Sequence, residues 1–167
     1  MRKILFFVFL IFCIQSTALL QAQTEVRLLY QKAAIEEESC KKLLALLKPF
    51  NENNNTLFAG YKACATMMMA NYVFSPFSKL SHFLRGKKLL EKAIEADRKN
   101  IELRFLRFTV QTNTPSFLAY HHAMQEDKLF LIQSVSSLTD KNLKQIIISY
   151  LAKSEQLTPG EKKRLVS

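Results

Sequence analysis

The histidines and cysteines of this sequence are the side chains with the greatest capacity for chemistry. His121 and His122 stand close to Glu126, and positions 122 and 126 share one face of a helix. Zinc takes three or four protein ligands, and no cysteine or further histidine lies nearby in the sequence, since His82 is distant. We therefore expect no metal site here, and we interpret these histidines as surface or core residues.

A nucleophilic centre has no better support in the sequence. Ser81 and His82 are adjacent, so on a helix they project about 100° apart and do not face each other. The chain has only 3 glycines, too few for a phosphate-binding loop, a dinucleotide fingerprint or a nucleophile elbow. We expect a protein without catalytic activity and without a cofactor.

Arg104 and Arg107 are the candidate anion-binding residues. They lie three positions apart on a face of a predicted helix that Gln111 extends. Two guanidinium groups so placed can hold one phosphate or carboxylate. The alternative is an exposed polar face, or an ion pair with an acidic neighbour in the chain.

Met67 and Met69 are the candidate groove residues. They belong to a run of three methionines that sweeps about 200° around a helix. Methionine adapts to irregular surfaces and is frequent in promiscuous binding grooves. The alternative is that they fill the core, since the helix around them is apolar on nearly all sides.

Cys40 and Cys64 are the candidates for a disulfide. The predicted helices 24–48 and 55–72 should form an antiparallel hairpin centred near residue 52, twelve positions from either cysteine. Both cysteines lie on apolar stripes, and an exported protein meets an oxidising compartment. The alternative is a pair of buried, reduced thiols, because many facing positions on packed helices exceed the roughly 7 Å between Cα atoms that a bridge allows.

Helices must position these side chains, since no segment is typical of a strand. A hydrophobic content of 49% with 3 glycines and 4 prolines argues against disorder and against a turn-rich β fold. We predict an all-α fold of antiparallel hairpins with about six to seven helices. Their ranges are 24–48, 55–72, 76–96, 100–112, 115–138 (one helix, or two broken near residues 120–122), 140–153 and 159–166.

Two of these helices carry further expectations. Helix 55–72 has a single charge, Lys62, and should be the most buried element. Helix 76–96 should begin at the Ser75–Pro76 pair and bury Phe77, Leu80, Phe83, Leu84, Leu90 and Ala93.

Residues 1–22 are predicted to be a signal peptide, followed by a single helical domain over 23–167. Arg2 and Lys3 precede the apolar run 4–14, and cleavage is expected after Ala18 or Ala22. The apolar run is shorter than the roughly 20 residues of an ordinary membrane span. We therefore expect a periplasmic or secreted protein that can associate with a membrane without spanning it.

The net charge of +10 comes from 24 basic and 14 acidic residues. Removing the leader leaves 22 basic residues, a net charge of +8. No block of five or six basic residues exists, which favours a solvated surface over a nucleic-acid site.

Residues 86–100 resemble the second helix of a tetratricopeptide repeat. That helix has a small residue, a large apolar residue four positions later and an alanine three positions after that. Gly86, Leu90 and Ala93 occupy these positions, and a turn similar to the family's comes next, with Arg98 in place of its proline.

The preceding helix resembles the repeat more loosely, through Leu57, Gly60 and Tyr61, and the loop 72–75 breaks the period of about 34 residues. The methionine-rich helix, the Phe-Ser-Pro-Phe loop and the Lys-Lys-Leu-Leu-Glu-Lys-Ala-Ile run also resemble a group of small exported bacterial helical proteins of unknown function. The resemblance to a tetratricopeptide repeat implies stacked hairpins with a concave binding face.

The sequence leaves two functions open. The first is a protein-binding or scaffold module of the cell envelope, with an unidentified protein partner. The second is a basic protein that binds anionic envelope components through helices 76–96 and 100–112.

Overall fold

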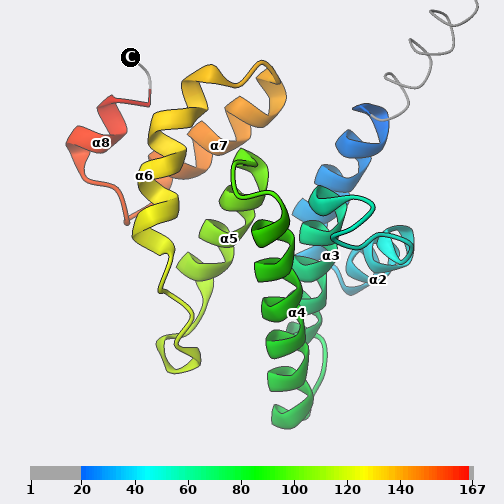
Figure 1. Ribbon diagram of the computed structural model, residues 1–167. Coiled ribbons are helices and arrows are strands. Elements are labelled where there is room, and N and C mark those ends of the chain that lie inside the picture. Colours follow the sequence, from blue (N-terminus) through cyan, green and yellow to red (C-terminus); the bar gives the residue numbers. More distant parts are fainter. Residues whose placement is uncertain (1–19, 166–167) are drawn as a thin grey trace, which may run out of the picture.

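The computed structural model describes residues 20–165, and all regular secondary structure in that range is helical, which confirms the predicted all-α fold (Figure 1). The predicted leader lies almost entirely outside the described residues. Residues 20–33 are helical. The next helices along the chain are α2 (Glu37–Leu47), α3 (Thr56–Met68), α4 (Pro76–Ala96), α5 (Ile101–Asn113), α6 (Met124–Ser134), α7 (Lys141–Lys153) and α8 (Pro159–Lys163), with 3-10 turns η1 (Met69–Asn71), η2 (Ser116–Leu118) and η3 (Val135–Ser137).

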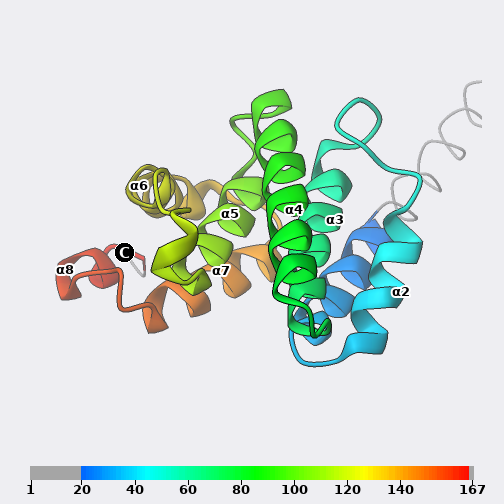
Figure 2. The ribbon, with the colours of Figure 1, turned by 90° about the horizontal axis from the view of Figure 1, so that it is seen from below.

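Helices α3 and α4 form the central hairpin. Segment 20–33 and α2 lie on one side of this hairpin, and α5 lies on the other (Figures 1 and 2). Helices α6, α7 and α8 lie beyond α5. The chain therefore forms two helical layers, one N-terminal and one C-terminal, that meet along α5.

The predicted helix 24–48 is wrong in one respect, because it is two helices separated by a turn at residues 34–36. The Ser39 hydroxyl donates to the Glu36 carboxylate at 2.6 Å at the start of α2. The turn lets both pieces bury an apolar face, with Ala33 before it and Leu43 after it fully buried. No proline or glycine marks the break, so the sequence pattern carries no signal for it.

Helix α3 is buried over nearly its whole length, as predicted, and only Thr56, Leu57, Lys62 and Met68 are partly exposed. The Asn55 side chain caps this helix by accepting from the Phe58 backbone N–H.

Helix α4 has the predicted bounds, but the expected burial of Phe77, Leu80 and Leu84 is wrong, since all three are exposed. The buried positions of α4 begin only at Phe83. The first turns of the helix have no partner on that face.

Helix α5 belongs to both apolar clusters of the fold. Leu103 and Leu106 pack with α2, α3 and α4, whereas Phe105 and Phe108 pack with α6, α7 and the leucines on either side of α8. A helix buried on two opposite sides has little surface for charged residues, yet α5 carries three. Buried charges of this kind require oppositely charged partners on neighbouring segments of the chain.

Candidate functional site

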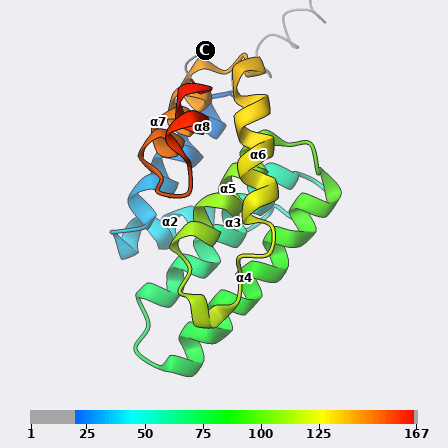
Figure 3. The same cartoon turned by 90° about the vertical axis from the view of Figure 1, so that its left-hand side faces the viewer.

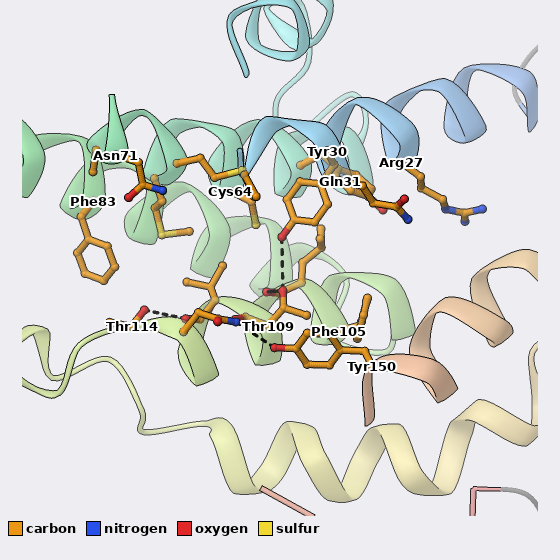
Figure 4. A pocket seen from close by; sticks show the side chains of 18 of the residues that line it. Arg27, Tyr30, Gln31, Cys64, Asn71, Phe83, Phe105, Thr109, Thr114 and Tyr150 are labelled. Carbon is orange, nitrogen blue, oxygen red and sulfur yellow. Dashed lines mark hydrogen bonds between the residues drawn. The ribbon is translucent and has the colours of Figure 1, made fainter. Parts of the chain in front are cut away.

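An apolar groove of about 1350 Å³ lies between the two helical layers (Figure 4). Segment 20–33, α3 and α4 form one wall, and α5, η2 and α7 form the other. Small-molecule sites commonly enclose roughly 300–1,000 Å³, so this groove has room for a sizeable ligand. The apolar lining includes Tyr30, Met67, Phe83, Phe105, Val110 and Ile146.

A contact between two hydroxyls crosses the groove. The hydroxyls of Tyr30 and Thr109 lie 3.4 Å apart and join the two walls (Figure 4). Burial raises the pKa of Tyr30 well above its ordinary value, so its phenol stays neutral. On the C-terminal wall the Tyr150 hydroxyl lies 2.7 Å from the Thr112 hydroxyl and accepts from the Asn113 amide at 3.0 Å. These groups are uncharged hydrogen-bonding groups at the walls of the groove.

The charged residues that line the groove are all cationic. They are Arg27, Lys79 and Lys153, and no aspartate or glutamate is among the lining residues. The two lysines are exposed, and within residues 20–165 neither has a carboxylate within ion-pair distance. The groove therefore combines apolar walls with an uncompensated positive charge.

Arg27 holds the two walls together. Its guanidinium donates to both carboxylate oxygens of Glu102 at 2.6 and 2.7 Å, and to Asp140 at 2.7 Å. Burial alone would lower the pKa of Arg27, but the bonds to Glu102 and Asp140 outweigh it and raise the pKa. Tyr61 of α3 also donates to Glu102. We call Arg27, Glu102 and Asp140 the clasp, since they join segment 20–33, α5 and the start of α7.

Arg104 and Arg107 do not face solvent, and the expectation of an external anion between them is wrong. Asp127 of α6, which is fully buried, accepts from both guanidinium groups. Arg107 also donates to Glu91 at 2.8 Å, and Arg104 donates to Glu126. The chain's own carboxylate occupies the place expected for a ligand, which corresponds to the alternative of an internal ion pair.

Gln111, the third residue of that candidate site, is fully buried on α5. Neither atom of its amide has a hydrogen-bond partner among the described residues. It is not among the residues that line the groove. It therefore extends neither an anion site nor the groove.

The two candidate groove methionines lie in different places. Met67 is buried and lines the groove, together with its neighbour Met68. Met69 is half-buried against the N-terminal apolar cluster and is absent from the groove lining. Met67 thus belongs both to the groove lining and to the N-terminal apolar cluster, whereas Met69 belongs to the cluster alone.

Cys40 and Cys64 are both buried and free, so the predicted disulfide is absent from the structure. The Cys40 thiol donates to the Ala65 carbonyl at 3.3 Å, whereas Cys64 lines the groove near Tyr30 (Figure 4). Neighbouring positions on a helix project about 100° apart. Cys40 therefore approaches α3 at residue 65, and the Cys64 side chain points elsewhere.

The thiols of the folded protein should react very slowly. Burial raises the pKa of Cys40 to about 11 and that of Cys64 to about 12. Because the thiolate is the reactive form, alkylation by iodoacetamide at pH 8 is expected to be at least about 100-fold slower than in the unfolded chain. A processed chain, which lacks Cys13, should show two free thiols after unfolding in denaturant without reductant. A count of fewer than two free thiols would contradict the prediction that Cys40 and Cys64 are both reduced.

His121 and His122 have different protein neighbours. The ring of His121 lies 3.0 Å from the Thr114 carbonyl, and that of His122 packs near Tyr120. Among residues 20–165 no group of three or more histidine, cysteine or acidic side chains is placed to hold a metal ion. None of the helices in this range is both long enough and apolar enough to cross a membrane.

The sequence pattern missed the groove and the clasp. Residues such as Arg27 and Asp140 occur on helices where charged residues ordinarily face solvent, and 113 positions separate them. One usable signal was present, since apolar residues surround Glu102 and Arg104 on both sides in the sequence of α5. Comparison of the chain with protein-family models, with curated proteins and with solved structures gave no match.

Proposed function

We propose that this protein is an exported binding protein without catalytic activity, and that its site is the groove between the two helical layers. Its ligand is an amphiphile with a long apolar chain and an anionic head. The observation that carries this proposal is the lining, which is mainly apolar and includes two exposed lysines but no acidic residue. Apolar walls favour a hydrocarbon chain, and Lys79 and Lys153 favour a carboxylate or phosphate at its end.

A slender ligand fits this groove better than a helix of a partner protein. An α-helix with its side chains is roughly 10–12 Å across. The hydroxyls of Tyr30 and Thr109, which lie 3.4 Å apart, cross the space between the walls. A hydrocarbon chain passes beside this contact, whereas a helix would have to separate it. A protein partner, as expected from the sequence, is therefore the less favoured occupant of the groove.

The sequence also left open a protein that binds anionic envelope components through α4 and α5. In the structure, the arginines of α5 are not available for such binding. These two arginines are neutralised by Asp127, Glu91 and Glu126. The exposed cations of α4, among them Arg85 and Lys88, keep their charge available.

Displacement of a fluorescent long-chain fatty acid tests the groove. Ala70 lines it, and Ala70→Trp should fill the space and lower probe affinity at least about tenfold. The matched control is Ala45→Trp, on an exposed position of α2 outside the groove, which should bind as the parent does. Unchanged binding in Ala70→Trp would contradict the site.

Competition by dodecanoate and by its methyl ester tests the charge. The double change Lys79→Gln and Lys153→Gln should weaken competition by dodecanoate about fivefold for each lysine, at about 1 kcal/mol each. Competition by the uncharged ester should not change. If competition by the acid and by the ester weakened equally, the two lysines would not bind the anionic head of the ligand.

A further inference from the structure

Helix α4 carries two apolar stripes, and only one of them is packed. The inner stripe includes Phe83 and Leu90 and lies against α3. The outer stripe consists of Phe77, Leu80 and Leu84, whose spacing of three and four residues places them on one helix face. An outer stripe of this kind is unusual for a surface helix, since the face opposite the core is ordinarily polar.

Two phenylalanines outside α4 are also exposed, Phe74 just before the helix and Phe117 in η2. Phe74, Phe77 and Phe117 are 101%, 86% and 83% exposed, values at which a phenylalanine ring has almost no protein contact. The start of α4 and η2 lie at the same end of the molecule (Figures 1 and 3). We call Phe74, Phe77, Leu80, Leu84 and Phe117 the apolar edge.

Positive charge surrounds the apolar edge. Residues 53–90 contain no aspartate or glutamate. Arg85 and Lys88 are exposed on α4 beside the outer stripe, and neither has a carboxylate partner within residues 20–165. Phenylalanine and leucine flanked by arginine and lysine on one helix form the pattern of a segment that lies in the interface of an anionic membrane.

We infer that the protein docks through the apolar edge onto the surface of a lipid bilayer with anionic headgroups. The rings of Phe74, Phe77 and Phe117 enter the boundary between headgroups and acyl chains, while Arg85 and Lys88 contact the lipid phosphates. A second copy of this chain fits the edge less well. In a two-fold interface the same cations would face each other without compensation.

The apolar edge is continuous with the groove, because Leu80 and Phe117 belong to both. An amphiphile leaving a docked bilayer can thus enter the groove along apolar side chains. This inference goes beyond the proposed function, and each can fail alone. Groove binding is measured with a soluble fatty acid, and docking is measured with intact vesicles.

Tryptophan fluorescence gives the most direct test, since the chain contains no tryptophan. Phe77→Trp should show a blue-shifted emission with phosphatidylglycerol vesicles and should be quenched by lipids brominated on their acyl chains. The matched control is Ile35→Trp, because Ile35 is 81% exposed but lies outside the apolar edge. Its emission should not change. An unshifted and unquenched Phe77→Trp would overturn the proposal.

Vesicle co-sedimentation tests which side chains carry the affinity. The triple change Phe74→Ser, Phe77→Ser and Phe117→Ser should weaken binding at least about tenfold, since each ring loses its transfer from water. Its melting temperature should equal that of the parent, because the three rings are exposed. Equal vesicle binding by the triple variant would overturn the proposal.

Charge is tested with two pairs of variants. The double variant Arg85→Gln with Lys88→Gln should bind vesicles about fivefold more weakly for each cation removed. Salt at 1 M should likewise weaken vesicle binding by the parent. The matched pair Arg98→Gln with Lys99→Gln removes equal charge at the other end of α4 and should bind as the parent does. Equal loss in both pairs would show that overall charge, and not docking by this edge, drives binding.

All variants are compared as protein purified after export, with the first residue determined by mass spectrometry. They share one N-terminus, so any contribution of residues 1–19 cancels. Sedimentation velocity of the same samples supplies the remaining outcome. A parent dimer that the triple phenylalanine variant dissociates, with no vesicle binding, would overturn docking in favour of a homodimer interface.

Discussion

Asp127→Asn is expected to lower the free energy of unfolding by about 3–5 kcal/mol, because it leaves two buried arginines without their shared carboxylate. Asp127 is fully buried and accepts from both Arg104 and Arg107. Their remaining partners, Glu126 and Glu91, lie closer to the surface and each bonds only one of them. Denaturant unfolding followed by circular dichroism measures the loss.

Glu126→Gln is the matched control for this prediction. Its side chain is 70% exposed and pairs with Arg104 from the surface. Exposed ion pairs contribute about 0–1 kcal/mol, so this variant should unfold close to the parent. A loss of less than 1 kcal/mol for Asp127→Asn, or equal losses for both variants, would show that the buried pair does not stabilise the fold.

Gly86→Ala is the second change with a large expected effect. A Cβ at this position would lie 2.6 Å from the Ala63 carbonyl oxygen and 2.9 Å from the Met67 backbone nitrogen. Both are backbone atoms of α3, so relief requires moving the two helices of the central hairpin apart. We expect a loss of about 1–3 kcal/mol or more, although alanine is the better helix former.

Alanine substitutions at two other glycines are the comparison variants for this prediction. Gly160→Ala in α8 meets nothing within 4 Å and should be neutral or gain about 0.5–1 kcal/mol. Gly60→Ala would meet the Leu103 side chain, and a side chain can rotate where a backbone cannot. The order of thermal stability should therefore be Gly160→Ala, then Gly60→Ala, then Gly86→Ala. If Gly86→Ala were as stable as Gly60→Ala, the backbone contact would not limit the hairpin.

The helices were predictable from the sequence because their ends carry local chemical signals. Thr158 and Glu161 form a capping box, and Pro76 begins α4. Asn100 and Asp140 cap α5 and α7. Such signals act within one helical turn, so one sequence suffices to find them. The turn at residues 34–36 has no such signal and was missed.

The environment of individual side chains was less predictable, because it depends on contacts between distant helices. Arg104 and Arg107 share a helix face, as expected, but a carboxylate 20 positions beyond Arg107 determines that this face is internal. Phe77 continues the apolar periodicity of α4 without a partner helix. Periodicity shows which residues share a face, and it does not show whether another element covers that face.

The clasp also has a consequence for the order in which the molecule assembles. Arg27 is 75 positions from Glu102 and 113 from Asp140, so its bonds close very long loops of chain. Contacts between neighbouring helices, such as α3 with α4, form at a small loop-closure cost and are fast, whereas distant contacts form late. A growing chain can complete its central hairpin long before residue 140 exists. The groove is therefore finished last, and a partly synthesised chain lacks the complete groove.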